Sequence, residues 1–239
     1  SFFAYPGKAS WLTPEGCEIT TLATGEEDIP AALEALARRL QTTAEPETQA
    51  RQTPPLPGDA PLSAEAIGTA MTVLLPENAI VVDEGVTCGL LVYLMTQGAA
   101  SHDWLTLTGG AIGQGLPVAL GAAIARPAQK VVALQADGSA MYTVQALWSM
   151  VRESADVAVV LLNNSSYAIL AIELERVGAG MDNDKTRSLL DLSRPDIDFC
   201  AIARGLGMPA TRAATGSEFV EQFSKAMATP GPCLIEAMI

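Results

Sequence analysis

The chain has 239 residues, 49% of them hydrophobic, so it can bury the core of one large domain or of one domain plus part of another. Its net charge of −13 argues against a nucleic acid or an anionic membrane as a partner, because no dense basic patch offsets the acids. No two of the four cysteines form a CxxC motif, so we expect buried or partly buried free thiols in a reducing, cytoplasmic compartment. The cysteines are Cys17, Cys88, Cys200 and Cys233.

No signal-peptide pattern opens the chain. The apolar stretch 109–125 is broken by glycines and by Pro117, so we do not expect it to span a bilayer. The sequence starts abruptly with the apolar run SFFAY at Ser1, which is typical of the middle of a domain. We therefore expect this chain to be a fragment of a longer protein.

Residues 1–45 are predicted to be the tail of a central α/β domain. A short strand is expected at 18–23 and a helix at 29–40, where apolar residues recur at helical spacing. One strand and one helix cannot close a core, so most of that domain is expected upstream. Residues 46–62 are rich in proline, threonine and charge without any period, which indicates an exposed linker.

Residues 63–239 show a regular alternation of helix and strand patterns. Ser63 is expected to cap a helix in which Ile67, Met71 and Leu74 face the core. The stretch 177–197 is predicted to be a loop, because it is rich in glycine, aspartate and asparagine. Strands are expected at 79–83, 105–107, 130–136, 157–162 and 233–237, and further helices at 87–95, 115–126, 143–152, 168–175, 199–204 and 217–228.

This alternation predicts an α/β fold, with a mainly parallel, doubly wound sheet and helices on both faces. The runs VVAL and VAVVLL are apolar at every position, as expected of strands buried on both faces. Ligands of such sheets bind at the carboxyl ends of the strands. The loops after Asp83, Leu107, Leu134 and Leu162 are therefore the candidate site.

Polar residues follow two of the buried strands. Asp137-Gly138 and Asn163-Asn164 are separated by the 24 residues 139–162, the length of one crossover, so both loops are expected at the same sheet edge. A buried carboxylate needs a cation, and carboxylate, amide, main-chain and phosphate oxygens form the set that Mg²⁺ prefers. The pair predicts a Mg²⁺ ion that holds a diphosphate, although two ordinary Asp and Asn turns would explain each motif singly.

The segment 109–117 is glycine-rich, in an order reversed from that of a dinucleotide-binding fingerprint. We expect it to let a flat ligand lie against the backbone, and a tight loop before a close-packed helix is the alternative. Thr87, at an expected helix start, is a candidate for receiving phosphate oxygens. We expect His102, the only histidine, in a surface loop without a role in a Ser-His-Asp triad.

These motifs resemble a known family. The spacing from Asp137-Gly138 to Asn163-Asn164 is similar to the GDG–about 25–NN signature of thiamine-diphosphate enzymes, with Ala136 in place of the first glycine. Residues 63–239 resemble the C-terminal, diphosphate-binding domain of the acetolactate synthase, benzoylformate decarboxylase and pyruvate decarboxylase superfamily. Residues 1–45 resemble the end of the family's central domain.

The resemblance implies a role for each matching position. Mg²⁺ would be bound by the side chains of Asp137 and Asn164 and by the carbonyl of Ser166. Four residues would surround the diphosphate: Thr87, Gly138, Ser139 and Tyr167. Two would act on the reacting part of the cofactor: the Gly110 carbonyl would receive the aminopyrimidine amino group, and Ile112 would be the wedge that bends thiamine diphosphate.

One partner that the family requires is not found in this sequence. In the family, a glutamate on the pyrimidine-binding domain of a neighbouring subunit contacts the pyrimidine ring and activates the cofactor. Glu84 lies on the diphosphate side and does not match it. We therefore expect a homodimer or homotetramer of a longer subunit, and expect this chain alone to bind the cofactor weakly and not to turn over.

The resemblance leaves the substrate open. The sequence Gly85-Val86-Thr87-Cys88 stands where acetolactate synthases usually carry Gln-His, which favours an acetolactate synthase-like decarboxylase or carboligase acting on a 2-oxo acid. A true acetolactate synthase is the second reading. A non-catalytic cofactor-binding domain that pairs with separate subunits is the third.

Overall fold

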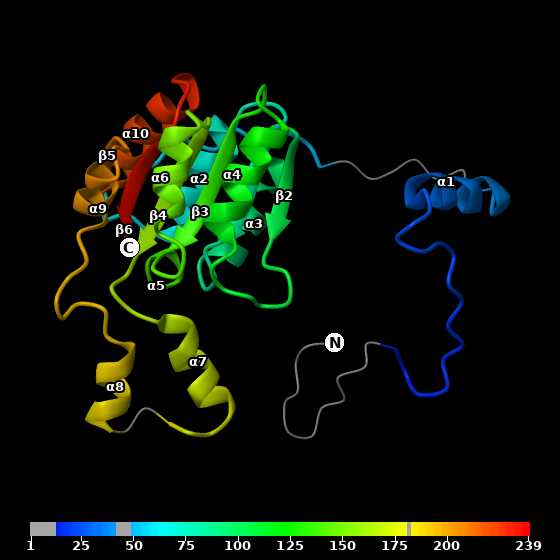
Figure 1. The fold of residues 1–239 in the computed structure, drawn as a ribbon, viewed down its shortest axis with the longest axis horizontal. Coiled ribbons are helices and arrows are strands. Elements are labelled where there is room, and N and C mark those ends of the chain that lie inside the picture. The colour runs from blue at the N-terminus through cyan, green and yellow to red at the C-terminus, as the bar shows by residue number, and fades with distance from the viewer. Residues whose placement is uncertain (1–12, 42–48, 181–182) are drawn as a thin grey trace. The chain divides into compact units, whose positions relative to one another are not determined.

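The computed structural model describes residues 13–41, 49–180 and 183–239. The chain folds as two compact units, Ser1–Gln49 and Ala50–Ile239 (Figure 1). Part of the predicted tail and part of the predicted linker fall on 1–12 and 42–48, outside the described residues. The assignment of the first unit to a central domain stays a prediction.

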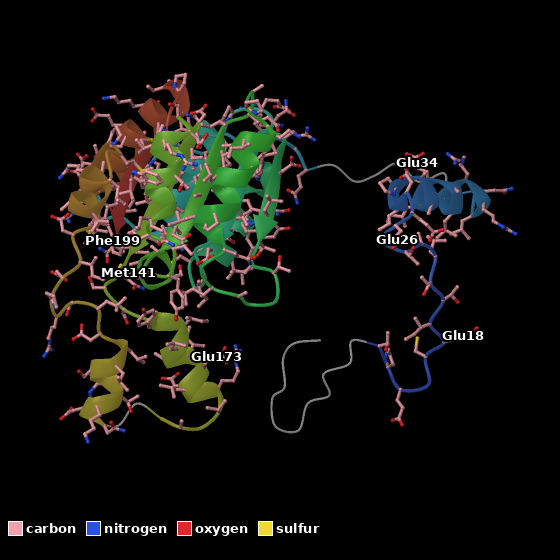
Figure 2. All side chains as sticks on the ribbon, in the orientation of Figure 1. Glu18, Glu26, Glu34, Met141, Glu173 and Phe199 are labelled. Carbon is pink, nitrogen blue, oxygen red and sulfur yellow. The ribbon has the colours of Figure 1, made fainter. Side chains whose placement is uncertain are left out.

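The first unit contains the helix α1, Ile29–Arg39, as expected. It begins at Asp28, whose side chain accepts a hydrogen bond from the Ala31 N–H at 3.0 Å, and Pro30 occupies its first turn. No residue of α1 is buried. The strand expected at 18–23 is wrong: this stretch has irregular backbone, and the described residues of the unit offer it no strand to pair with. Figure 2 labels Glu18, Glu26 and Glu34 on this unit.

The second unit includes residues that the sequence assigns to the linker. The Gln52 N–H donates to the Gly98 carbonyl at 2.8 Å, and the Leu62 N–H donates to the Ala214 carbonyl at 2.9 Å. The Leu62 side chain is buried, whereas the stretch before it is largely exposed. The end of the predicted linker is therefore fastened to the domain that it precedes.

A six-stranded sheet forms the centre of the second unit, in the order β2-β1-β3-β4-β6-β5. Every pair of neighbouring strands is parallel, which confirms the predicted α/β fold class. The strand β4 is buried at every position, as its apolar run predicts. The strands are β1 Ala79–Glu84, β2 His102–Thr106, β3 Val131–Ala136, β4 Val157–Asn163, β5 Ala210–Ala213 and β6 Cys233–Met238.

Helices cover both faces of this sheet. On one face Leu116, Met150 and Phe199 bring α4, α6 and α9 into one core cluster, and Figure 1 shows α4 and α6 in front of the strands. On the other face Met71 and Phe223 bring α2 and α10 into a second cluster. The helices are α2 Ala64–Leu74, α3 Gly89–Met95, the 3₁₀ helix η1 Thr96–Gly98, α4 Gly115–Ala125, α5 Asp137–Ala140, α6 Ala146–Arg152, α7 Ala168–Arg176, α8 Asp184–Leu190, α9 Phe199–Gly205 and α10 Gly216–Ala228.

Several elements differ from the sequence prediction. The strand β2 begins at His102, which we expected in a surface loop, and the short helix α5 was not expected. The strand β5 was not expected, because its four residues lie at the sheet edge and form no apolar run. The helix α8 lies in the stretch predicted to be a loop, and buries only Leu190. The helix α10 begins one residue earlier than predicted, because Thr215 and Glu218 form a reciprocal capping box at its start.

The four cysteines are free thiols. The prediction of buried or partly buried thiols is wrong for Cys17, which is exposed on the first unit. Cys200 is buried, and burial beside Glu236 raises the pKa of its thiol to about 11. Among the described residues, no helix is long and apolar enough to cross a membrane.

Candidate active site

A pocket lies at the carboxyl end of the sheet. Its wall is built from the loops after β1, β3 and β4, together with Ile112 and Ile239. The strands β2 and β3 lie on opposite sides of β1, so the chain changes winding direction at this point. Such switch points open a crevice for ligands in parallel sheets.

The structure brings almost all of the predicted site residues into this pocket. Gly110 does not line it, although it belongs to the same loop as Ile112 and has a positive φ of 69° that suits glycine. The role of each residue stays a prediction. The predicted residues that line the pocket are Thr87, Ile112, Asp137, Gly138, Ser139, Asn164, Ser166 and Tyr167.

Asp137 has the environment of a metal ligand. Its side chain is 3% exposed, and its Oδ1 accepts a hydrogen bond from the Gly138 N–H at 2.8 Å. Its buried Oδ2 has no hydrogen-bond partner within the described ranges. Burial raises the pKa of this carboxyl, while the N–H groups of Gly138 and of residues 164–166 act in the opposite direction. A buried carboxylate oxygen without a donor fits a bound cation.

The loop after β4 lies beside Asp137, because Ala136 pairs with Leu162 across β3 and β4. Asn164 Oδ1 accepts a hydrogen bond from the Ser166 N–H at 3.0 Å. Asn163 Oδ1 accepts one from the Ser165 N–H at 3.0 Å, and Ser165 has a positive φ of 53°. Two consecutive Asx turns therefore fix the loop that carries the other predicted metal ligands. The structure confirms that the two loops share one sheet edge.

An ion pair between a buried carboxylate and a half-exposed arginine supports this loop from behind, and the sequence prediction missed it. Glu236 on β6 is fully buried, and its Oε1 accepts a hydrogen bond from Asn163 Nδ2 at 2.8 Å. Its Oε2 accepts a hydrogen bond from Arg212 Nε on β5 at 3.0 Å and forms an ion pair with Arg212 Nη2 at 2.9 Å. A single acid in the apolar run CLIEAM is the signal that could have revealed it, because a buried carboxylate requires a partner.

Gly138 approaches the ring of Tyr167. A Cβ atom at Gly138 would lie 2.2 Å from Tyr167 Cε1, so no side chain fits while the ring keeps its place. Val86, on the opposite loop of the pocket, has a φ of 51°, which is rare for a β-branched residue. Such backbone strain is typical of binding sites. Figure 2 shows Met141, which follows α5, and Glu173 on α7 at this end of the sheet.

Replacing Gly138→Ala is expected to displace the Tyr167 ring and to lower the free energy of unfolding by about 1–3 kcal/mol through overpacking. Urea unfolding measures the loss. Tyr167→Ala removes the ring, so we expect Gly138→Ala to lower the free energy of unfolding less in a Tyr167→Ala background than in the unchanged protein. If Gly138→Ala costs the same free energy of unfolding with Tyr167 present and with Tyr167→Ala, the ring is not the obstacle.

The comparison with protein families matches residues 88–237 to the family described as "Thiamine pyrophosphate enzyme, C-terminal TPP binding domain". Two curated relatives are similar over most of the chain. One, from Mycobacterium tuberculosis and named "Putative acetolactate synthase large subunit", is 50% identical over 100% of this chain and 46% of its own length. The other, benzoylformate decarboxylase of Pseudomonas aeruginosa, is 33% identical over 87% of this chain and 39% of its own length.

A solved structure shares the fold. The thiamine diphosphate-dependent 4-hydroxybenzoylformate decarboxylase of Rhodococcus jostii superposes with a TM-score of 0.70 at 28% identity, over 87% of this chain and 38% of that one. The chain thus spans less than half the length of the relatives described.

Proposed function

The chain belongs to the thiamine pyrophosphate enzymes through their C-terminal TPP-binding domain, and we propose that its full-length protein uses thiamine diphosphate with Mg²⁺ to decarboxylate a 2-oxo acid. The observation that carries the proposal is Asp137 Oδ2, which has no hydrogen-bond partner in the described part of the chain and is buried in a pocket at the winding switch of the sheet. A thiamine diphosphate bound there supplies an electron sink for decarboxylation.

The residues of this chain would bind and orient that cofactor. Asp137 and Asn164, with the Ser166 carbonyl, would hold Mg²⁺ through oxygen atoms, which is the ligand type that this ion prefers. Gly138 leaves its backbone open to a phosphate, and Thr87 faces the same pocket. The Ser139 hydroxyl accepts a hydrogen bond from Gln135 Nε2 at 2.6 Å and donates one to the Ala136 carbonyl at 3.1 Å. Because its O–H is already used, Ser139 would approach the diphosphate through its backbone instead.

The other half of the site would come from a second subunit. We propose that a pyrimidine-binding domain of a neighbouring copy supplies the activating glutamate, and that the active form is a cytoplasmic homodimer or homotetramer. Glu84 does not replace that glutamate, because it does not line the pocket and its carboxylate is held by the backbone of this domain.

The relatives support two reactions. The name of the Mycobacterium tuberculosis relative favours an acetolactate-forming carboligase, whereas the two benzoylformate decarboxylases favour release of an aldehyde from an aryl 2-oxo acid. The Gly85-Val86-Thr87-Cys88 loop favours an acetolactate synthase-like decarboxylase or carboligase. It does not indicate which acceptor a carboligation would use.

The experiment supplies the full-length protein with thiamine diphosphate, Mg²⁺ and either pyruvate or a benzoylformate-type acid. We expect carbon dioxide release, with acetolactate from pyruvate or aldehyde from the aryl acid deciding the branch. Cofactor binding without turnover of any 2-oxo acid would instead support a non-catalytic cofactor-binding protein and would refute the proposal.

A further inference from the structure

Glu84, the last residue of β1, is a buried carboxylate without a role in the proposed binding of cofactor and metal. Its two oxygens accept three hydrogen bonds. Oε1 accepts from the Gly113 N–H at 2.8 Å and from Gln135 Nε2 at 3.0 Å, and Oε2 accepts from the Gly115 N–H. All three donors belong to segments distant from β1 in the sequence.

These bonds fasten the glycine-rich loop to the sheet. Gly115 is the first residue of α4, where a negative charge is favourable because the helix dipole is positive. A Cβ at Gly115 would lie 2.7 Å from the Glu84 Cβ and 2.6 Å from Gln135 Oε1, so the loop approaches as closely as glycine allows. Hydrogen bonds to a buried charge are worth about 1.5–3 kcal/mol each, so this attachment is strong.

The same network reaches the predicted diphosphate loop. Gln135 Nε2 donates both to Glu84 and to Ser139 Oγ, at 3.0 and 2.6 Å. Ser139 Oγ also lies 3.4 Å from the Glu84 carbonyl. Glu84 thus connects the loop that carries Ile112 with the loop that carries Asp137.

We propose that Glu84 is a positioning residue that fixes Ile112 in the pocket wall relative to the metal-binding loop. The inference rests on the proposed function, because it assigns Ile112 a place beside a bound cofactor. Glu84 does not line the pocket, so it acts through the loop and not on the substrate. Rigid placement of a pocket group contributes to rate by orienting the reacting atoms.

The test is Glu84→Gln in the full-length protein, measured by amide hydrogen exchange without cofactor and by kinetics with it. The carboxamide would point an NH₂ group at existing donors, so we expect exchange in residues 108–115 to rise about tenfold or more. We expect kcat to fall about tenfold, while the Kd of thiamine diphosphate changes less than about threefold. Glu77→Gln, an exposed acid just before the same strand, is the matched control and should change nothing.

Exchange that is unchanged at 108–115, or that rises equally in β1, β3 and β4, would overturn the proposal, because the second pattern reports general destabilisation. If Glu84→Gln does not fold, amide exchange in the unchanged protein tests the proposal instead. The amides of Gly113 and Gly115 must then exchange more slowly than the amide of Gly109, and equal rates would overturn the proposal. The exchange is measured without cofactor, so it does not depend on the proposed function. That function fails separately if the unchanged protein does not bind thiamine diphosphate.

Discussion

Asp137→Ala is expected to abolish the Mg²⁺-dependent binding of thiamine diphosphate, with a loss of affinity of at least about 100-fold. The carboxylate is the only charged side chain among the predicted ligands, and its buried Oδ2 has no other partner among the described residues. Without it, the proposed Mg²⁺ ion would lose its anionic protein ligand. Titration calorimetry of the full-length protein, with cofactor and Mg²⁺, measures the effect.

The same variant separates binding from folding. Burial raises the pKa of the Asp137 carboxyl, so at neutral pH its ionised form destabilises the metal-free fold. Removing it should leave the melting temperature without metal unchanged or higher. Asp103→Ala, an exposed carboxylate on β2, is the control and should bind the cofactor normally. An Asp137→Ala protein with unchanged affinity would refute the metal assignment.

Arg212→Met is expected to destabilise the protein by at least about 2 kcal/mol, because it leaves the fully buried carboxylate of Glu236 without its cation. We expect a smaller loss of stability than the roughly 3–5 kcal/mol measured when a fully buried ion pair is broken, because half of the Arg212 side chain is exposed and screened by solvent. Chemical denaturation measures the loss. If the proposed Mg²⁺ site is right, its binding should also weaken, since Glu236 holds Asn163 at the base of the loop that carries the predicted ligand Asn164.

A double variant tests the cause. Arg212→Met combined with Glu236→Gln removes the buried charge but keeps an oxygen that can accept from Asn163 Nδ2, so most of the stability should return. Arg126→Met, on an exposed arginine after α4, should be neutral. A double variant less stable than Arg212→Met alone would show that the charge is not the source of the loss.

Much of this fold could be predicted because its signals are local. The strands β3 and β4 begin with continuous apolar runs, and the helix α2 begins at a serine cap, so pattern alone locates them. The strand β5 could not be found this way, because its residues pair only through β6, and that pairing is a long-range property. The helix α8 was hidden by the polar composition that also makes loops.

The same distinction between local and long-range signals applies to the site. The Asp137 and Asn164 loops were predictable because the crossover length alone returns them to one sheet edge. The supports behind them were not, because Glu84, Gln135 and Glu236 meet their partners across the sheet, far away in sequence. Their one signal in the sequence is a polar residue within or at the end of a buried strand. Such a residue indicates that a partner exists, but not which residue that partner is.

The most direct test of the proposed function is calorimetric titration of the full-length protein with thiamine diphosphate, first with Mg²⁺ and then with a chelator. We predict saturable binding at one site per subunit with Mg²⁺, and a loss of affinity of at least about 100-fold when the chelator removes it. Binding of equal strength in both titrations would contradict the metal-anchored site at Asp137, and no binding in either would contradict the proposed function.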